Sequence, residues 1–371
     1  MKRIPLIRPY LPIGTKEKVC EVLDSGYLTE GPVTKQFEDL FSQYVGSQYA
    51  LAVCNCTVGL EVALRALGIG SGDEVIVPDY TYPATASVVD IVGATVVLVD
   101  VERDSMLIDQ EAMAAAVTPR TRAIIPVSMF GNPLDYSRLN AFKAETGITI
   151  IEDAACSIGA AFNGQMVGSL ADMSVFSLHP RKFITTGEGG VITTNNPVWA
   201  EWMDSYKHFG MARGQSTREE ILFQRVGTNY KLSNILSAVG LVQMQRVDEL
   251  LTRRRELAAR YEAELVSVPG ITLPRLVEGG RHSYQTFCVL IEDRDRVMNR
   301  LRRRGIEAQI GTYSLHQHPA FKPGSRCRWF SSFPNSLHDF THALALPLYH
   351  EMTKEEQDWV IDELKAAISV G

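Results

Sequence analysis

The sequence has 371 residues, of which 45% are apolar and 22% are charged, the proportions of an ordinary soluble globular protein. Its formal net charge of −6 argues against a broad basic surface for nucleic acid. No stretch approaches the roughly 20 apolar residues that a membrane helix needs, and no long apolar core of a signal peptide follows Met1-Lys2-Arg3. We therefore expect a cytoplasmic protein that binds neither nucleic acid nor membrane, with one large domain and a smaller one.

Cysteines and histidines give little support for a metal site. Cys54 and Cys56 are too close together for the usual zinc knuckle, and no second close pair could complete four ligands. His316 and His318 stand beside Pro319, where two histidines are more often a loop feature than a metal site. We expect free thiols in a reducing cytosol and no metal.

The first two thirds of the chain repeat a unit of apolar strand, loop and helix. Two helices come first, at 15–26 with Thr15 as its cap and at 34–46. The predicted strands are 49–53, 74–77, 95–99, 123–127, 148–151, 174–178 and 190–194. The helices between them are predicted at 57–67, 84–92, 111–117 and 137–146. Because the strands are apolar without alternation, both faces of the sheet must be covered, which predicts a mostly parallel α/β sheet flanked by helices.

The pattern changes after residue 233. Residues 234–265 read as one long helix, with Arg253-Arg254-Arg255 on its solvated side. A strand at 283–290 and helices at 293–304 and 354–368 follow, which is typical of a small α+β domain. We predict a large domain at 1–240 and a small C-terminal domain at 241–371.

Lys182 is the most unusual charged residue of the chain. It lies in the stretch Ser-Leu-His-Pro-Arg-Lys-Phe-Ile-Thr-Thr-Gly-Glu-Gly-Gly, at 177–190, between two apolar runs. Burying an unpaired ammonium group costs several kcal/mol, so a lysine in this setting needs a chemical reason.

Other reactive groups follow neighbouring strands. Asp153 comes just after strand 148–151, and the carboxyl ends of strands are where α/β proteins bind ligands. Thr57 opens a helix directly after a strand, so the first N–H groups there form a seat for a phosphate. Tyr82 follows another strand and offers a flat ring. Each residue alone has a plainer explanation, but with Lys182 they match what pyridoxal phosphate requires: an amine, an acid for the ring nitrogen, a phosphate seat and a stacking ring.

Longer motifs surround these residues. The most specific is Ser-x-His-x-x-Lys at 177–182 together with Thr-Thr-Gly-Glu-Gly-Gly at 185–190, and others lie at 26–32, 66–75, 152–155, 227–233, 282–284 and 346–349. With these motifs, nearly the whole chain resembles the sugar aminotransferases of the DegT/DnrJ/EryC1/StrS group, within the fold-type I aminotransferase superfamily. The resemblance implies a fold-type I transferase dependent on pyridoxal 5′-phosphate, with a mostly parallel central sheet flanked by helices and a smaller α+β C-terminal domain.

The resemblance also implies roles by position. Lys182 would form the Schiff base with the cofactor, where desolvation and the cationic ring would lower its pKa, and Asp153 would pair with the ring nitrogen. Tyr82 would stack on the ring. Asn229 would reach the phosphate of the neighbouring subunit, which implies a homodimer with shared active sites. The remaining cofactor positions are Thr57, the amide of Cys56, Cys156 and Ser177, and the candidate substrate positions are His179, Arg181, Tyr313 and His316.

Several positions depart from the pattern of this family. Cys56 stands where the family usually has glycine, and Cys156 where it has Gln or His near the phenolic oxygen of the cofactor. A thiol is a weak hydrogen-bond partner, so substrate fit or electronic tuning there should differ. Ser128 replaces a common histidine, and Arg181 a small residue, where it would contact a nucleotide phosphate, the donor carboxylate or a surface carboxylate.

The expected function is transfer of an amino group, from L-glutamate as in the family, to a keto group of a nucleotide-linked deoxysugar for amino sugar and polysaccharide biosynthesis. Pyridoxamine 5′-phosphate would be the intermediate form of the cofactor. Lys182, where dehydratases of the family carry histidine, favours transamination over dehydration. The closest rival is an aminotransferase for an aminocyclitol or another keto substrate. Two further functions stay open: an amino-acid lyase, and a regulatory protein that binds the cofactor without turnover.

Overall fold

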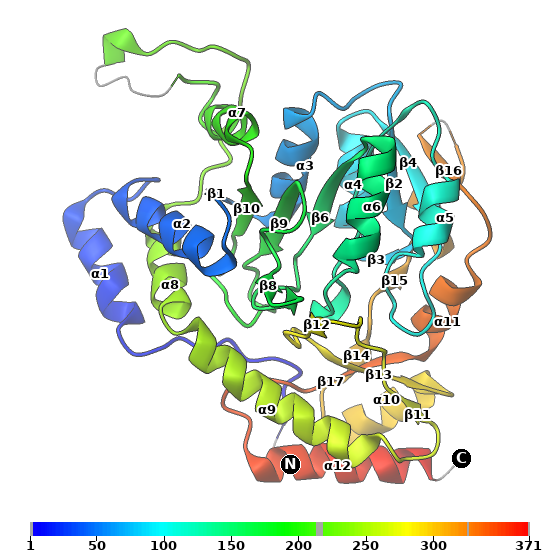
Figure 1. Ribbon diagram of the computed structural model, residues 1–371. Coiled ribbons are helices and arrows are strands. Elements are labelled where there is room, and N and C mark those ends of the chain that lie inside the picture. The colour runs from blue at the N-terminus through cyan, green and yellow to red at the C-terminus, as the bar shows by residue number, and fades with distance from the viewer. Residues whose placement is uncertain (1–2, 213–217, 325, 370–371) are drawn as a thin grey trace.

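The computed structural model describes residues 3–212, 218–324 and 326–369, and an eight-stranded sheet forms its centre (Figure 1). Its strands lie in the order β1 (Tyr49–Val53), β10 (Gly190–Thr194), β9 (Met173–Ser177), β6 (Thr149–Asp153), β5 (Thr121–Ile124), β2 (Glu74–Pro78), β4 (Thr95–Val99) and β16 (Cys327–Trp329). Strand β10 pairs antiparallel with β1 and β9, and the other neighbours pair parallel. The predicted mostly parallel sheet is confirmed.

Helices cover both faces of this sheet. On one face lie α2 (Pro32–Val45), α5 (Gln110–Ala115), α6 (Tyr136–Thr146) and α8 (Asn234–Met244), with α1 (Thr15–Ser25) packed on α8. On the other face lie α3 (Cys56–Ala66), α4 (Ala84–Ile91) and α7 (Pro197–Lys207). Successive strand residues alternate between the two cores: Ile76 of β2 faces the first, and Val75 and Val77 face the second. This two-sided burial explains why the strand sequences are apolar throughout.

A smaller antiparallel sheet of four strands lies beside the large one, at the lower end of Figure 1. It contains β11 (Ile271–Thr272), β13 (Phe287–Ile291), β17 (Ala343–Leu346) and β14 (Gln309–Ile310). It forms a third core with α9 (Val247–Leu265), α10 (Arg294–Arg303) and α12 (Lys354–Ile368). Short elements complete the fold: β3 (Tyr80–Thr81), which pairs with β15 (Tyr313–Ser314), the three-stranded group of β7 (Ala161–Phe162), β8 (Gln165–Met166) and β12 (Gly280–Arg281), and α11 (Pro334–His342).

The chain crosses between the two sheets in both directions. Strand β16, late in the sequence, pairs with β4 of the large sheet, while Ile4 near the start packs in the third core. The division into residues 1–240 and 241–371 therefore stays a prediction. None of the helices in the described ranges is both long and apolar enough to cross a membrane.

The predicted helix at 234–265 is two helices, α8 and α9, because Arg246 leaves the helical conformation at φ −120° and ψ 16°. The prediction that its arginine run is a solvated face is wrong. Arg254 is only 4% exposed, and its Nη2 donates to the carbonyls of Gln285 at 2.6 Å and Leu348 at 3.2 Å. Arg253 and Arg255 also donate to main-chain carbonyls of other segments. The three arginines therefore connect α9 by hydrogen bonds to segments that are distant in sequence.

The first helix also begins differently from the prediction. Gly14, not Thr15, is the residue that precedes α1, and it makes no side-chain cap. Thr15 is buried instead, and its hydroxyl donates to the Pro12 carbonyl at 2.7 Å.

Candidate active site

The predicted reactive residues gather at the carboxyl ends of two adjacent parallel strands. Asp153 is the last residue of β6 and pairs in register with Val175 of β9, whose last residue is Ser177. Lys182 follows in the turn that leads to β10. Because β6 and β9 run in the same direction, both functional groups emerge at one edge of the sheet, the usual position of ligand sites in α/β proteins.

The main chain around Lys182 is held by two glutamines. Gln285 donates to the Arg181 carbonyl at 2.8 Å and accepts from the Phe183 amide at 3.1 Å, so it binds the backbone on both sides of the lysine. Gln243, from α8, accepts from the Thr185 amide at 3.0 Å. These contacts fix the position from which the lysine side chain extends.

The amine of Lys182 lies among polarisable and acidic groups. Its Nζ donates to Cys156 Sγ at 3.1 Å, and both residues are half-buried. Burial acts to lower the pKa of Lys182, as the sequence predicts. The interaction and hydrogen bond with the Cys156 sulfur, together with the charge of Asp153, outweigh burial and raise the pKa of Lys182 above the usual value. Without the cationic ring of a cofactor, the amine is therefore held in its protonated form.

Asp153 is a buried acid with few partners. It is 5% exposed, accepts a hydrogen bond from Thr85 Oγ1 at 2.8 Å, and accepts one from the Ala155 amide at 3.2 Å. Burial raises the pKa of Asp153, although these hydrogen bonds and the Lys182 charge oppose the shift. A cationic ring nitrogen against this carboxyl group would relieve the cost of its ionisation.

Helix α3 begins beside these groups. Asn55 caps it, accepting from the Val58 amide at 2.9 Å, so the N–H groups of Cys56 and Thr57 remain in the first turn, where a helix has no internal partners for them. Gly190 passes directly beneath this turn: a Cβ there would lie 2.7 Å from the Cys56 nitrogen. The thiol of Cys56 donates to the Val175 carbonyl at 3.7 Å, and burial raises its pKa well above the usual value, so it is a neutral side chain packed on the sheet.

The remaining predicted cofactor residues surround this edge. Ser177 is buried and accepts from the His179 amide at 3.4 Å. Tyr82 is 65% exposed, and its ring centroid lies 6.2 Å from that of Tyr313. Asn229 is exposed and accepts from Lys231 Nζ at 2.6 Å.

The residues fit pyridoxal phosphate in the nature of their groups. The amine of Lys182 and the acid of Asp153 act on each other electrostatically at one edge of the sheet. The first turn of α3 supplies main-chain amides, and Gly190 beside it has no side chain that would crowd them. Among the candidate substrate residues, His179 and Arg181 are exposed in the Lys182 turn. His316 is buried under Phe333, and its Nδ1 lies 2.7 Å from Asp79 Oδ2.

Thr85 and Gln285 were not predicted from the sequence, although they bind Asp153 and the Lys182 turn directly. A hydroxyl in the first turn of α4, just after a strand, is the signal that could have identified Thr85. Ser128, noted only as a departure from the family, contacts the buried Glu152. Tyr136 and Ser174 also donate to that carboxyl group.

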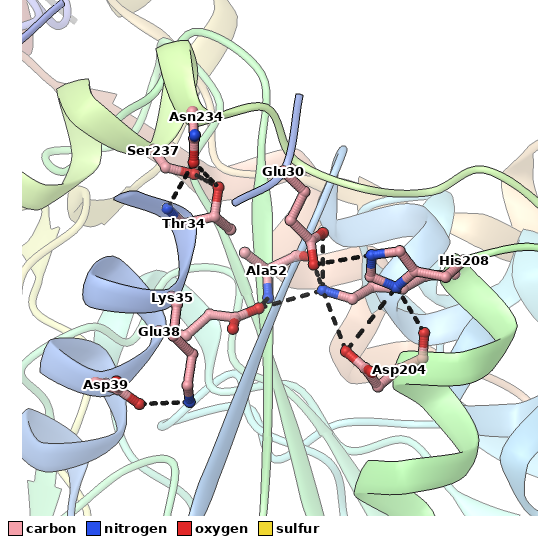
Figure 2. A network of polar contacts seen from close by, with 11 residues as sticks. Glu30, Thr34, Lys35, Glu38, Asp39, Ala52, Asp204, His208, Asn234 and Ser237 are labelled. Atoms are coloured by element: carbon pink, nitrogen blue, oxygen red, sulfur yellow. Dashed lines mark hydrogen bonds and ion pairs between the residues drawn. The ribbon is translucent and has the colours of Figure 1, made fainter. Parts of the chain in front are cut away.

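A second charged cluster lies beside Ala52 of β1 (Figure 2). Glu30, Asp204 and His208 form the one group of side chains in the described ranges with a geometry that could hold a metal ion. The ammonium group of Lys207 already lies 3.0 Å from Glu30 Oε2, 3.2 Å from Glu38 Oε1 and 3.9 Å from Asp204 Oδ1. Lys207 thus supplies the positive charge that these carboxylates need.

Comparison with known proteins shows which family the chain resembles in sequence and structure. Residues 14–365 match the DegT/DnrJ/EryC1/StrS aminotransferase family. The chain is similar to a Streptococcus pneumoniae protein described as a sugar aminotransferase, solved in its PMP form, with 29% identity and a TM-score of 0.93 over 99% of both chains. It is similar to DesV of S. venezuelae, solved with a ketimine intermediate, with 31% identity and a TM-score of 0.89 over 99% of this chain and 98% of that one. It is also similar to 3-amino-5-hydroxybenzoic acid synthase, with 27% identity and a TM-score of 0.91 over 100% of both chains.

Proposed function

Because the chain belongs to the DegT/DnrJ/EryC1/StrS aminotransferase family, we propose that it transfers an amino group from L-glutamate to a keto group of a nucleotide-linked deoxysugar. The enzyme is an aminotransferase dependent on pyridoxal 5′-phosphate, with the fold of the fold-type I aminotransferases. The observation that carries the proposal is the placement of Lys182 and Asp153 at the ends of adjacent parallel strands, where their charges act on each other.

The cofactor supplies an electron sink for the bonds at the reacting carbon. In the proposal, Lys182 holds the cofactor and then moves a proton to and from the reacting carbon, for which its amine must become neutral. Asp153 would hold the ring nitrogen in its protonated state, and Thr85 would orient that carboxyl group through its hydrogen bond at 2.8 Å. Tyr82 would stack on the ring.

The phosphate would bind at the start of α3. The amides of Cys56 and Thr57 and the hydroxyls of Thr57 and Ser177 provide neutral donors, and the helix dipole favours negative charge there. Asn229 would reach the phosphate of a second copy of the chain, which makes the proposed enzyme a homodimer with shared active sites.

The nucleotide-linked substrate would enter beside the exposed residues of the Lys182 turn. Arg181 and His179 are exposed there, and the guanidinium group of Arg181 suits a diphosphate or the donor carboxylate. Tyr313, near Tyr82, would line the same entrance. His316 is too enclosed to contact a substrate in this conformation, so its predicted substrate role requires movement of its neighbours. The six free cysteines accord with the proposed cytoplasmic location.

The proposal is tested by half-reactions. The purified protein should be yellow, and borohydride should fix the cofactor to Lys182, as peptide mapping would show. Glutamate alone should bleach the colour with stoichiometric release of 2-oxoglutarate, which neither a lyase nor a binding-only protein would produce. Each keto-sugar nucleotide of a panel is then added to the bleached enzyme, and return of the colour identifies the substrate.

Two variants complete the test. Lys182→Ala should lower turnover by roughly a thousandfold, in the range typical of losing a positioned acid–base group. The matched control Lys143→Ala removes a partly exposed lysine that pairs with Asp172, and it should turn over normally. Full activity of Lys182→Ala would refute the proposed chemistry.

A second candidate is an aminotransferase for an aminocyclitol or another keto substrate. It is favoured by the similarity to 3-amino-5-hydroxybenzoic acid synthase, whose product carries no nucleotide. The same assay separates the two: a keto-cyclitol that restores the colour where every keto-sugar nucleotide fails would support this second candidate.

A further inference from the structure

The contact between Cys156 and Lys182 brings a thiol and a primary amine together. Lys182 Nζ and Cys156 Sγ lie 3.1 Å apart, and both side chains keep part of their surface open to solvent. The pair is part of a group of four that act on one another electrostatically, the others being Cys56 and Asp153. Because neither residue is fully buried, we expect a small reagent that enters the active site to reach the sulfur.

The surroundings of Cys156 are those of a reactive cysteine. Reactive cysteines lie in partly exposed, electropositive positions, because nearby cations stabilise the thiolate. Lys182 is one such cation. The second is Arg254, whose guanidinium acts electrostatically on Cys156 and whose own hydrogen bonds go to main-chain carbonyls of Tyr284, Gln285 and Leu348.

We propose that Cys156 is an oxidative modification site that forms a covalent S–N cross-link with Lys182 when a hydroperoxide oxidises the protein. In the first step the Cys156 thiolate attacks the O–O bond, which breaks. An S–O bond forms, sulfur loses two electrons and the peroxide gains them. The second oxygen takes a proton from the Lys182 ammonium group and leaves as water or an alcohol, so the Lys182 amine becomes neutral. In the second step the neutral Lys182 amine attacks the sulfenic sulfur, the N–S bond forms, the S–O bond breaks, and the hydroxide takes the amine proton to leave as water.

The first step prepares the second. A sulfenic acid is neutral, so oxidation weakens the interaction with the Cys156 sulfur that raises the pKa of Lys182. Burial then favours the neutral amine, which is the nucleophile that the second step requires. The contact at 3.1 Å places the two atoms together before reaction, which is the proximity that raises the rate of intramolecular steps.

This modification would bear on the proposed function, on which its biological meaning rests. The cross-link consumes the amine to which the cofactor attaches, so an oxidised protein could not be loaded. Bound cofactor occupies the same amine and should protect it. Two thiol equivalents would reverse the link: the first attacks sulfur, releases the amine and leaves a mixed disulfide, and the second frees Cys156.

The test uses the full-length protein with and without pyridoxal 5′-phosphate, treated with hydrogen peroxide and digested for mass spectrometry. We expect linked peptides containing residues 156 and 182 whose mass is lower than the sum of the free peptides by two hydrogens. Cofactor should suppress them and dithiothreitol should remove them. As a second readout, the uptake of cofactor by the oxidised apoprotein, measured by absorbance, should fall in proportion to the linked fraction. Cys156→Ser should lose the cross-link, and the matched control Cys20→Ser, at an exposed cysteine, should keep it.

Sulfinic or sulfonic acid at Cys156 with unmodified Lys182, or a disulfide between Cys156 and Cys56, would overturn the proposal. If Cys156→Ser does not fold, the peptide map of the unsubstituted protein decides the question alone. A cross-link together with full activity of Lys182→Ala would refute the aminotransfer chemistry but leave the modification site standing. Loss of activity in Lys182→Ala without any cross-link would do the reverse.

Discussion

Asp339 is a carboxyl group that the fold buries completely on α11. It is 0% exposed, and its Oδ2 has no hydrogen-bond partner in the part of the chain that the structure describes. Burial, together with the nearby charge of Asp100, raises the pKa of Asp339 to about 8. An acid whose pKa is higher in the folded state stabilises the fold only while it stays protonated, so its contribution is complete below the unfolded pKa and is lost as pH rises toward 8.

Asp339→Asn should therefore stabilise the protein, and more so at higher pH. The amide does not titrate. The variant therefore avoids the loss of stability, on the order of a few kcal/mol, that arises where the unfolded acid is ionised and the folded acid stays protonated. The gain should be small near pH 4, grow up to about pH 8, and then level off. Urea unfolding across this pH range measures it, with Asp39→Asn at an exposed carboxylate as the control. A gain that does not depend on pH would contradict this account.

Lys207 is a buried charged residue that has partners of opposite charge. It is 1% exposed, and its ammonium group joins Glu30 and Glu38 and donates to the Ala52 carbonyl at 3.1 Å. Removing one member of a buried ion pair leaves an uncompensated charge, so Lys207→Met should lower the free energy of unfolding by about 3–5 kcal/mol.

Lys35 provides a matched control beside the Lys207 cluster (Figure 2). It pairs with Asp39 at 2.6 Å, but both side chains are more than half exposed, so Lys35→Met should cost less than about 1 kcal/mol. Adding Glu38→Gln to Lys207→Met should recover part of the loss, because it removes a carboxylate that the lysine no longer neutralises. Equal effects of the two lysine substitutions in urea unfolding would show that burial does not govern this cluster.

At the scale of elements, two asparagine helix caps allow an effect on folding stability to be distinguished from an effect on cofactor binding. Asn55 at α3 and Asn196 at α7 each accept a main-chain hydrogen bond at 2.9 Å in the first turn. Either Asn→Ala change should cost about 1 kcal/mol of folding stability. Only Asn55→Ala should also weaken binding of pyridoxal 5′-phosphate, because α3 alone begins at the proposed phosphate seat. Fluorescence titration of the cofactor checks this, and equal weakening in Asn196→Ala would locate the phosphate elsewhere.

The sequence determines these elements well where the signal is local. Strands β1, β4 and β10 and helix α12 have the predicted bounds, and α12 also carries a capping box from Thr353 and Glu356. The break at Arg246 was missed because no proline or glycine marks it. The burial of Arg254 was missed because its carbonyl partners lie 30 or more positions away in sequence.

The sequence likewise predicts one part of the candidate site and not another. Asp153 and Lys182 could be placed at one edge because they follow adjacent strands. The contact of Lys182 with Cys156 depends on how two turns fold. The hydrogen bonds of Gln285 to the main chain on both sides of the lysine depend on the same folding. No pattern within a single segment encodes either of them.

At the scale of the whole molecule, the segment that carries Asn229 lies along the same edge as the phosphate seat. The Tyr230 carbonyl accepts from the Cys54 amide at 2.9 Å, and Lys231 bridges to Val53 at the end of β1. The chain just before it exposes large apolar side chains at Phe223 and Val226, 64% and 95% exposed. A second copy of the chain would bury this surface, as the proposed homodimer requires.

The proposed sharing of active sites can be tested by mixing two impaired variants. Lys182→Ala lacks the lysine proposed to hold the cofactor, and Asn229→Ala lacks the side chain proposed to reach the partner's phosphate. If Asn229 acts across the interface, each mixed dimer has one complete site, formed by Lys182 of one copy and Asn229 of the other. Random pairing makes about half of the dimers mixed. The pooled sample, refolded together and assayed at limiting cofactor, should then exceed the mean activity of the two separate variants. If Asn229 serves its own chain, no mixed dimer contains a complete site, and mixing should give only that mean.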